Sequence, residues 1–188
     1  MSATFNSPIT KTYSSTSGAA LTLSDESAQA KIVVRAAAGT PVRAALAQSF
    51  AGSRVADGVL IAGTRPDEWM LIGDPDAVRA HVDDLATDGH VSIVDWTHGR
   101  AQFRLTGAVA SSALEKICGL DWSDAMMPDG AVTSGSVAKV TCDLIRNDID
   151  GQPSYLVLVD RSFGQYLFDT IIDSGDEFGI STVVENAS

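Results

Sequence analysis

Residues 91–105 have the sequence VSIVDWTHGRAQFRL. The first six residues form an apolar run, and residues 101–105 alternate between apolar (Ala, Phe, Leu) and polar (Gln, Arg) side chains. A period of two places one row of side chains in a core and the other toward water, as in a half-buried β-strand. The turn at residues 97–100 contains a glycine and lies between the two runs. The stretch therefore predicts a β-hairpin.

Further strands and helices are predicted on both sides of this hairpin. A second hairpin is predicted from strands at 137–145 and 155–159, and short apolar or β-branched runs predict strands at 31–35, 58–62 and 69–73. Helices are predicted at 41–50, 74–88, 108–118 and 160–174, the second with Asp74 as a favoured N-cap before a proline. Hairpins without regular βαβ crossovers indicate an α+β fold, a largely antiparallel sheet with helices packed on one face.

The domain organisation follows from length and local composition. The 188 residues fit one domain, which we place at 31–180. Residues 1–30 are small and polar with little periodicity, so we predict a flexible N-terminal arm that is partly disordered or becomes ordered on a partner. Residues 181–188 form a predicted C-terminal tail. The N-terminus lacks the apolar core of a signal peptide, and no apolar run approaches the ~20 residues of a membrane helix. We therefore expect a soluble, cytoplasmic protein.

The charge balance limits the kinds of partner. The chain has 24 acidic and 13 basic residues, which give a formal net charge of -11. Nucleic-acid binders and proteins that dock on anionic lipid present basic surfaces instead. We expect neither nucleic acid nor membrane as a partner, and the simplest role of the charge is solubility.

Motifs for catalysis, phosphate binding and metal binding are missing from the sequence. The histidines His81, His90 and His98 do not have the spacing of metal ligands. His98 is the candidate reactive group because a turn exposes it beside an arginine, although a histidine in a hairpin turn is more often just a polar residue beside a glycine. Cys118 and Cys142 are predicted to be small buried hydrophobes. We therefore assign no catalytic, cofactor-binding or metal-binding residue.

Two apolar features are open to a structural or an interaction reading. The last predicted helix places Phe163, Tyr166, Leu167 and Ile171 on one face, in a band wider than a surface helix requires. That helix either lies deep in its own core or contacts another subunit with its flank. Trp122 lies with two methionines, 126 and 127, in an irregular segment that is either a protein-contact patch or local packing.

Four segments, in order, resemble the gamma subunit family of heterotetrameric sarcosine oxidase. They are RPDEWMLI at 65–72; Val94-Asp95 with Gly99-Arg100, Phe103–Leu105 and Gly107; Leu114–Lys116 with Cys118 and Leu120-Asp121; and Arg161–Phe163 with Tyr166-Leu167. The resemblance covers residues 65–178. Residues 1–60 have no clear counterpart in that family, and residues 122–127 depart from its usual pattern.

The resemblance implies a fold similar to the N-terminal part of the folate-binding aminomethyltransferase superfamily. It also implies a non-catalytic accessory subunit of a flavin-dependent sarcosine (N-methyl amino acid) oxidase complex in one-carbon metabolism. The implied partners are the larger alpha and beta flavoprotein subunits, which would carry FAD, FMN, NAD and tetrahydrofolate, with no cofactor on this chain. The alternative is a stand-alone folate-binding or aminomethyltransferase-like protein, whose Lys-Gly-Cys-Tyr-x-Gly-Gln signature is missing here.

Overall fold

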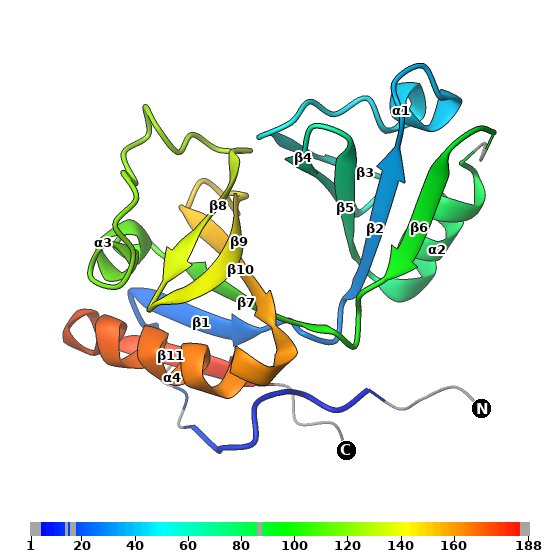
Figure 1. The fold of residues 1–188 in the computed structure, drawn as a ribbon. Coiled ribbons are helices and arrows are strands. Elements are labelled where there is room, and N and C mark those ends of the chain that lie inside the picture. The colour runs from blue at the N-terminus through cyan, green and yellow to red at the C-terminus, as the bar shows by residue number, and fades with distance from the viewer. Residues whose placement is uncertain (1–4, 14, 16–17, 86–87, 185–188) are drawn as a thin grey trace.

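The computed structural model describes residues 5–13, 15, 18–85 and 88–184, and it contains two β-sheets (Figure 1). Sheet A has the strand order β11-β1-β7-β10-β9-β8, and sheet B the order β3-β4-β5-β2-β6. The strands of sheet A are β1 (Leu21–Asp25), β7 (Arg100–Thr106), β8 (Val132–Val137), β9 (Val140–Arg146), β10 (Ser154–Asp160) and β11 (Ile180–Val184). Those of sheet B are β2 (Ala30–Ala36), β3 (Ser53–Ala56), β4 (Val59–Arg65), β5 (Glu68–Gly73) and β6 (Val91–Asp95).

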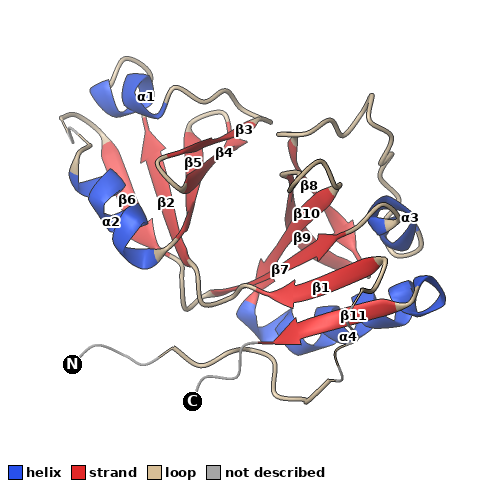
Figure 2. Ribbon diagram, turned by 180° about the vertical axis from the view of Figure 1, so that it is seen from behind, coloured by secondary structure: helices blue, strands red, loops and turns tan. Residues whose placement is uncertain are grey.

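Each sheet carries its helices on the side that faces away from the other sheet (Figures 1 and 2). Helices α1 (Pro41–Leu46) and α2 (Pro75–Asp83) accompany sheet B, and α3 (Ala110–Glu115) and α4 (Gly164–Gly175) accompany sheet A. The described strand pairs are antiparallel except for β1 with β11, which is parallel. The α+β, largely antiparallel fold is therefore confirmed, with the strands divided between two sheets where the sequence suggested one.

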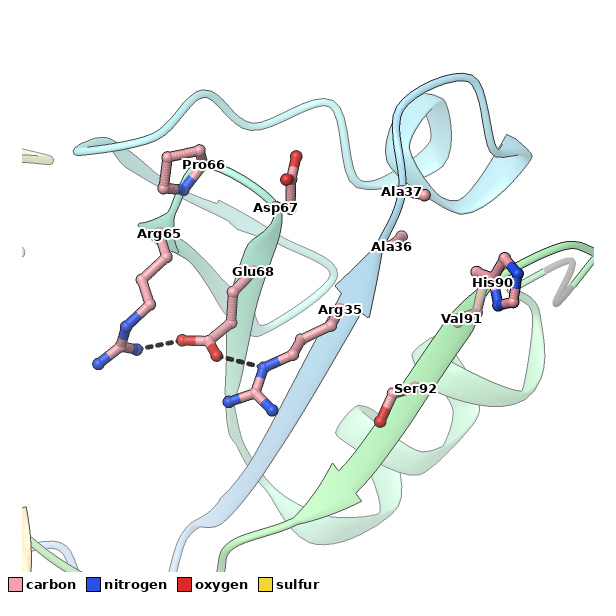
Figure 3. A pocket seen from close by; sticks show the side chains of 10 residues that line it. All are labelled: Arg35, Ala36, Ala37, Arg65, Pro66, Asp67, Glu68, His90, Val91 and Ser92. Carbon is pink, nitrogen blue, oxygen red and sulfur yellow. Dashed lines mark hydrogen bonds and ion pairs between the residues drawn. The ribbon is translucent and has the colours of Figure 1, made fainter.

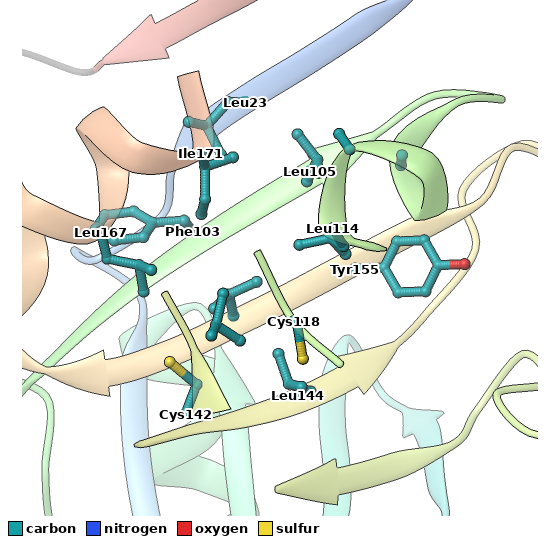
Figure 4. Close-up of a cluster of buried hydrophobic side chains, with 14 of the residues drawn as sticks. Leu23, Phe103, Leu105, Leu114, Cys118, Cys142, Leu144, Tyr155, Leu167 and Ile171 are labelled. Carbon is teal, nitrogen blue, oxygen red and sulfur yellow. The ribbon is translucent and has the colours of Figure 1, made fainter. Parts of the chain in front are cut away.

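Three apolar cores hold these layers together. The core between sheet A and its helices includes Phe103, Leu105 and Leu167 (Figure 4). A second core lies between sheet B and its helices. A third lies between the inner faces of the two sheets, from residues of β2, β4 and β5 on one side and of β8, β9 and β10 on the other: Val33, Leu60, Ala62, Met70, Ile72, Val132, Ile145, Leu156 and Leu158. Stacked sheets bury their facing side chains in this way.

The hairpin predicted over residues 91–105 is wrong, although both strands form where expected. Strand β6 pairs with β2, and β7 pairs with β1 and β10, so the turn after Asp95 carries the chain from sheet B to sheet A. A period-two pattern determines which face of a strand is buried but does not identify its neighbour. The second predicted hairpin is confirmed for β9 and β10, which pair antiparallel with Arg146 opposite Tyr155. The strand predicted at 137–145 begins too early, because Val137 ends β8 and residues 138–139 form the turn between β8 and β9.

The structure also differs from the sequence prediction near both ends of the chain. Strand β1 lies inside the predicted arm, 1–30, and β11 overlaps the predicted tail, 181–188. These two strands pair with each other, and Leu21 and Leu23 are fully buried. Two buried leucines in a five-residue strand give too short an alternation to be noticed in a polar segment. Residues 1–4, 14 and 16–17 of the arm and 185–188 of the tail lie outside the described residues.

Lys31 is buried where the chain passes between the two sheets. Its Nζ donates hydrogen bonds to the carbonyl oxygens of Ser27, at 2.8 Å, and Gln29, at 2.6 Å. Burial lowers the pKa of Lys31 to about 8, although the nearby carboxylates of Asp25 and Asp95 act in the opposite direction. A buried ammonium group therefore fixes the connection between β1 and β2.

The pKa of Lys31 predicts a stability change at alkaline pH. An unfolded lysine has a pKa of about 10.4, so the unfolded chain binds more protons than the native chain between pH about 8 and about 10.4. The unfolding free energy of the wild type should therefore rise across this window relative to Lys31→Met, by up to about 3 kcal/mol. Urea titrations followed by circular dichroism at several pH values measure this difference. A difference that stays constant across the window would contradict the prediction.

Candidate functional site

A groove of about 650 Å³ lies at one end of sheet B, between the turn that joins β4 to β5 and the beginning of β6 (Figure 3). Its polar lining residues are Arg35, Arg65, Asp67, Glu68, His90 and Ser92. The strand register aligns four of them, Arg65, Glu68, Arg35 and Ser92, in one row across β4, β5, β2 and β6. Directly opposite residues of paired strands point to the same face, so these four side chains share one face of the sheet.

Glu68 organises the row. Its side chain is 3% exposed, and its carboxylate accepts hydrogen bonds from Arg35 Nε at 2.6 Å, from Thr64 Oγ1 at 2.8 Å and from the Arg65 guanidinium. Burial by itself raises the pKa of Glu68, but the hydrogen bonds from Thr64, Arg35 and Arg65 outweigh it and hold the pKa below its usual value. Glu68 is therefore ionised at neutral pH and fixes both arginines.

The row carries a net positive charge because one carboxylate holds two guanidinium groups. The side chains of Arg35 and Arg65 are 54% and 52% exposed. Among the described residues, the one hydrogen bond of the Arg35 side chain is that from Nε to Glu68, which leaves its terminal nitrogens for another acceptor. Asp67 does not neutralise the row, because it pairs with Arg43. Such preorganised guanidinium groups bind carboxylates and phosphates.

His98 does not lie in this groove. Its ring contacts that of Phe5, with the centroids 5.5 Å apart. The neighbouring Arg100 pairs with Asp143 and Asp160 and lies over the Trp96 ring, and within the described part of the chain no contact joins it to His98. The structure therefore does not assemble the reactive pair considered from the sequence.

The interpretation of Trp122 as local packing is correct. Its side chain is 3% exposed and meets the ring of Tyr155 edge-on, with the centroids 5.3 Å apart. Met127 is also buried, and of this group only Met126 is exposed. The segment that follows α3 thus folds over the core of sheet A instead of presenting a contact patch.

The wide apolar band predicted for the last helix is buried only in part. Leu167 and Ile171 of α4 are fully buried, whereas Tyr166 of α4 and Phe163, which directly precedes the helix, are about half exposed. The Tyr166 hydroxyl donates a hydrogen bond to the carbonyl of Ala138. One face of the helix therefore belongs to the core, and its flank is accessible.

The prediction that both cysteines are small buried residues is confirmed. Cys118 and Cys142 are free and buried, and burial raises the pKa of the Cys142 thiol to about 12. No group of three or more His, Cys, Asp or Glu residues that could hold a metal ion occurs within the ranges that the structure describes. In the same ranges no helix is long and apolar enough to cross a membrane.

Comparison with known proteins finds one matching family model and several similar solved structures. The family model described as GCVT N-terminal domain matches residues 35–187. A chain of heterotetrameric sarcosine oxidase from Corynebacterium sp. U-96, in complex with pyrrole 2-carboxylate, is similar with a TM-score of 0.71 and 22% identity over 88% of this chain and 89% of that chain. Glycine cleavage system aminomethyltransferase T from Bartonella henselae is similar with a TM-score of 0.66 and 16% identity over 88% of this chain and 48% of that chain. No curated protein sequence is significantly similar to this chain.

Replacing Glu68 with glutamine should destabilise the protein in a pH-dependent way. At about pH 7 the unfolding free energy should fall by about 2 kcal/mol, since the buried acceptor of two arginines loses its charge. A lowered folded pKa gives stability that is present above the unfolded value of about 4.3 and is lost as the pH falls through the folded pKa. The difference in unfolding free energy between the wild type and Glu68→Gln should therefore become smaller as the pH falls. Urea titrations of both proteins between about pH 7 and about pH 3 measure this difference.

Asp67→Asn is the matched control, because it removes an exposed carboxylate of the same turn. Asp67→Asn should lower the unfolding free energy by less than about 1 kcal/mol. If Glu68→Gln and Asp67→Asn lowered the unfolding free energy equally, Glu68 would not be the residue that holds the row together.

Proposed function

Because this chain belongs to the GCVT N-terminal domain family, we propose that it is a non-catalytic accessory subunit of a flavin-dependent complex that oxidises sarcosine or another N-methyl amino acid. The observation that carries the proposal is the likeness, at comparable length, to a chain of a heterotetrameric sarcosine oxidase. In this proposal the larger alpha and beta flavoprotein subunits carry FAD, FMN, NAD and tetrahydrofolate. This chain binds none of them, and the complex serves one-carbon metabolism in the cytoplasm.

The use of the buried charges in this chain supports an accessory role. Arg146 donates to Asp124, Asp148 and the carbonyl of Met127, and so fixes the irregular segment before β8. Arg104 pairs with Glu26 at 2.6 Å. Catalytic groups usually need a perturbed pKa together with access to a substrate, whereas these groups are engaged in structural pairs.

Purification from the native host with an affinity tag on this chain tests the proposal. We expect larger flavin-bearing chains to co-purify, a yellow preparation, and hydrogen peroxide production that depends on sarcosine. Deleting the chain should lower the yield of assembled complex without changing flavin turnover in the complex that remains. A flavoprotein complex that assembles and turns over normally without this chain would refute the accessory role.

The second candidate is a stand-alone folate-binding or aminomethyltransferase-like protein. The family membership and the likeness to aminomethyltransferase T favour it, although this chain spans about half the length of that enzyme. Calorimetric titration of the isolated chain with tetrahydrofolate separates the two candidates. Saturable heat with a Kd below about 1 mM would favour folate binding by this chain, and its absence would count against it.

A further inference from the structure

Strand β6 is an uncovered edge of sheet B. It pairs with β2 on one side and, in the described part of the chain, with no strand on the other. Residues 92–95 are all exposed, including Ile93 and Val94, which point to opposite faces. Edge strands in natural proteins are usually protected by lysine, proline, a bulge or a covering segment. The VSIVD sequence of β6 offers only its terminal aspartate.

Two hydrogen bonds determine which backbone groups of β6 point outward. The Trp96 N–H donates to the Lys31 carbonyl at 2.8 Å, and the Ala37 N–H donates to the His90 carbonyl at 3.3 Å. Hydrogen-bonded pairs alternate along an antiparallel ladder, so the even-numbered residues of β6 bond to β2. The N–H and C=O groups of Val91 and Ile93 therefore point away from the sheet, where an added strand can use them.

The groove places a positive charge beside this edge. Ser92 lies directly opposite Arg35, and both side chains share the face that carries the row fixed by Glu68 (Figure 3). Neighbouring strands are about 4.8 Å apart, so a strand added to β6 would lie about 10 Å from β2. An acidic side chain opposite Ser92 would pass over this small residue and reach the terminal nitrogens of Arg35.

We propose that a partner chain adds a β-strand to β6 and that a carboxylate side chain of this strand, opposite Ser92, binds Arg35. Charge complementarity selects the partner, because the row is positive. A second copy of this chain is disfavoured, since two molecules of net charge -11 repel each other. The inference rests on the proposed accessory role for the existence of a partner, but it requires no particular enzyme activity.

Hydrogen exchange measured by NMR on the full chain tests the edge directly. In the free protein the Val91 and Ile93 amides should exchange much faster than those of Ser92 and Val94, which point to β2. The probe is a short acetylated peptide of alternating valine and threonine with one central glutamate. It should protect the Val91 and Ile93 amides with a Kd of about 1 mM, and the same peptide with a central lysine should bind about five-fold more weakly.

Two variants test the individual contacts. Arg35→Gln keeps a donor for Glu68 and should abolish the preference for the glutamate peptide, whereas Arg79→Gln on the exposed face of α2 should retain it. Ile93→Pro removes one outward N–H without touching the ladder to β2 and should prevent binding of both peptides. Three outcomes would overturn the proposal. The Val91 and Ile93 amides could stay unprotected in the presence of the glutamate peptide, or the two peptides could bind wild type equally well. The third outcome is protection of these amides that rises with protein concentration when no peptide is present.

Co-purification with tagged Ile93→Pro distinguishes this inference from the proposed function. If the flavoprotein complex assembles on this variant as it does on the wild type, the docking edge is refuted and the accessory role stands. If the peptide binds as expected but no flavoprotein co-purifies with the wild type, the accessory role is refuted and the docking edge stands.

Discussion

The apolar contact between the inner faces of the two sheets is the constraint on which the rest of the structure depends. Val33 and Met70 of sheet B pack there with Ile145 and Leu156 of sheet A. Sheet A covers the inner faces of β2, β4 and β5, whereas no residue of β6 belongs to the shared core. Charged groups are costly inside such a layer, so the polar row that Glu68 organises lies at its margin. The charged residues of the groove therefore lie outside the shared core, as does strand β6.

Buried charge in this protein marks the places where irregular chain must be held. Lys31 binds carbonyl oxygens of the connection between β1 and β2. Arg146 holds the segment between α3 and β8 through Asp124 and the carbonyl of Met127. Loops have few apolar contacts of their own, so a charged side chain with several donors is an effective way to fix them. Glu68 differs, because it fixes two side chains that remain open to solvent.

Local signals predicted the local parts of this fold. The Asp74 carboxylate accepts hydrogen bonds from the N–H groups of Asp76 and Ala77, as its N-cap position indicated, and α2 begins at the following proline. The neighbours of β6 and β7 could not be predicted, since pairing is decided by apolar faces far apart in the chain. The same holds for the candidate site. Arg35 and Glu68 are 33 residues apart and meet through the register of β2 and β5. Charged residues at or near the ends of otherwise apolar strands were the local sign of it.

The order of strands along the chain has a consequence for biosynthesis. All strands of sheet B lie between residues 30 and 95, so every residue that this sheet needs for its own strand pairing is available once residue 95 has left the ribosome. Sheet A contains β1 from the beginning of the chain and β11 from its end. Leu21 and Leu23 must therefore wait for residues 100–106 and 180–184 before both sides of β1 are paired. Contacts between such distant segments form slowly, so for much of its synthesis the nascent chain carries the strands of sheet B without sheet A against them, and the apolar β1 segment without its neighbours.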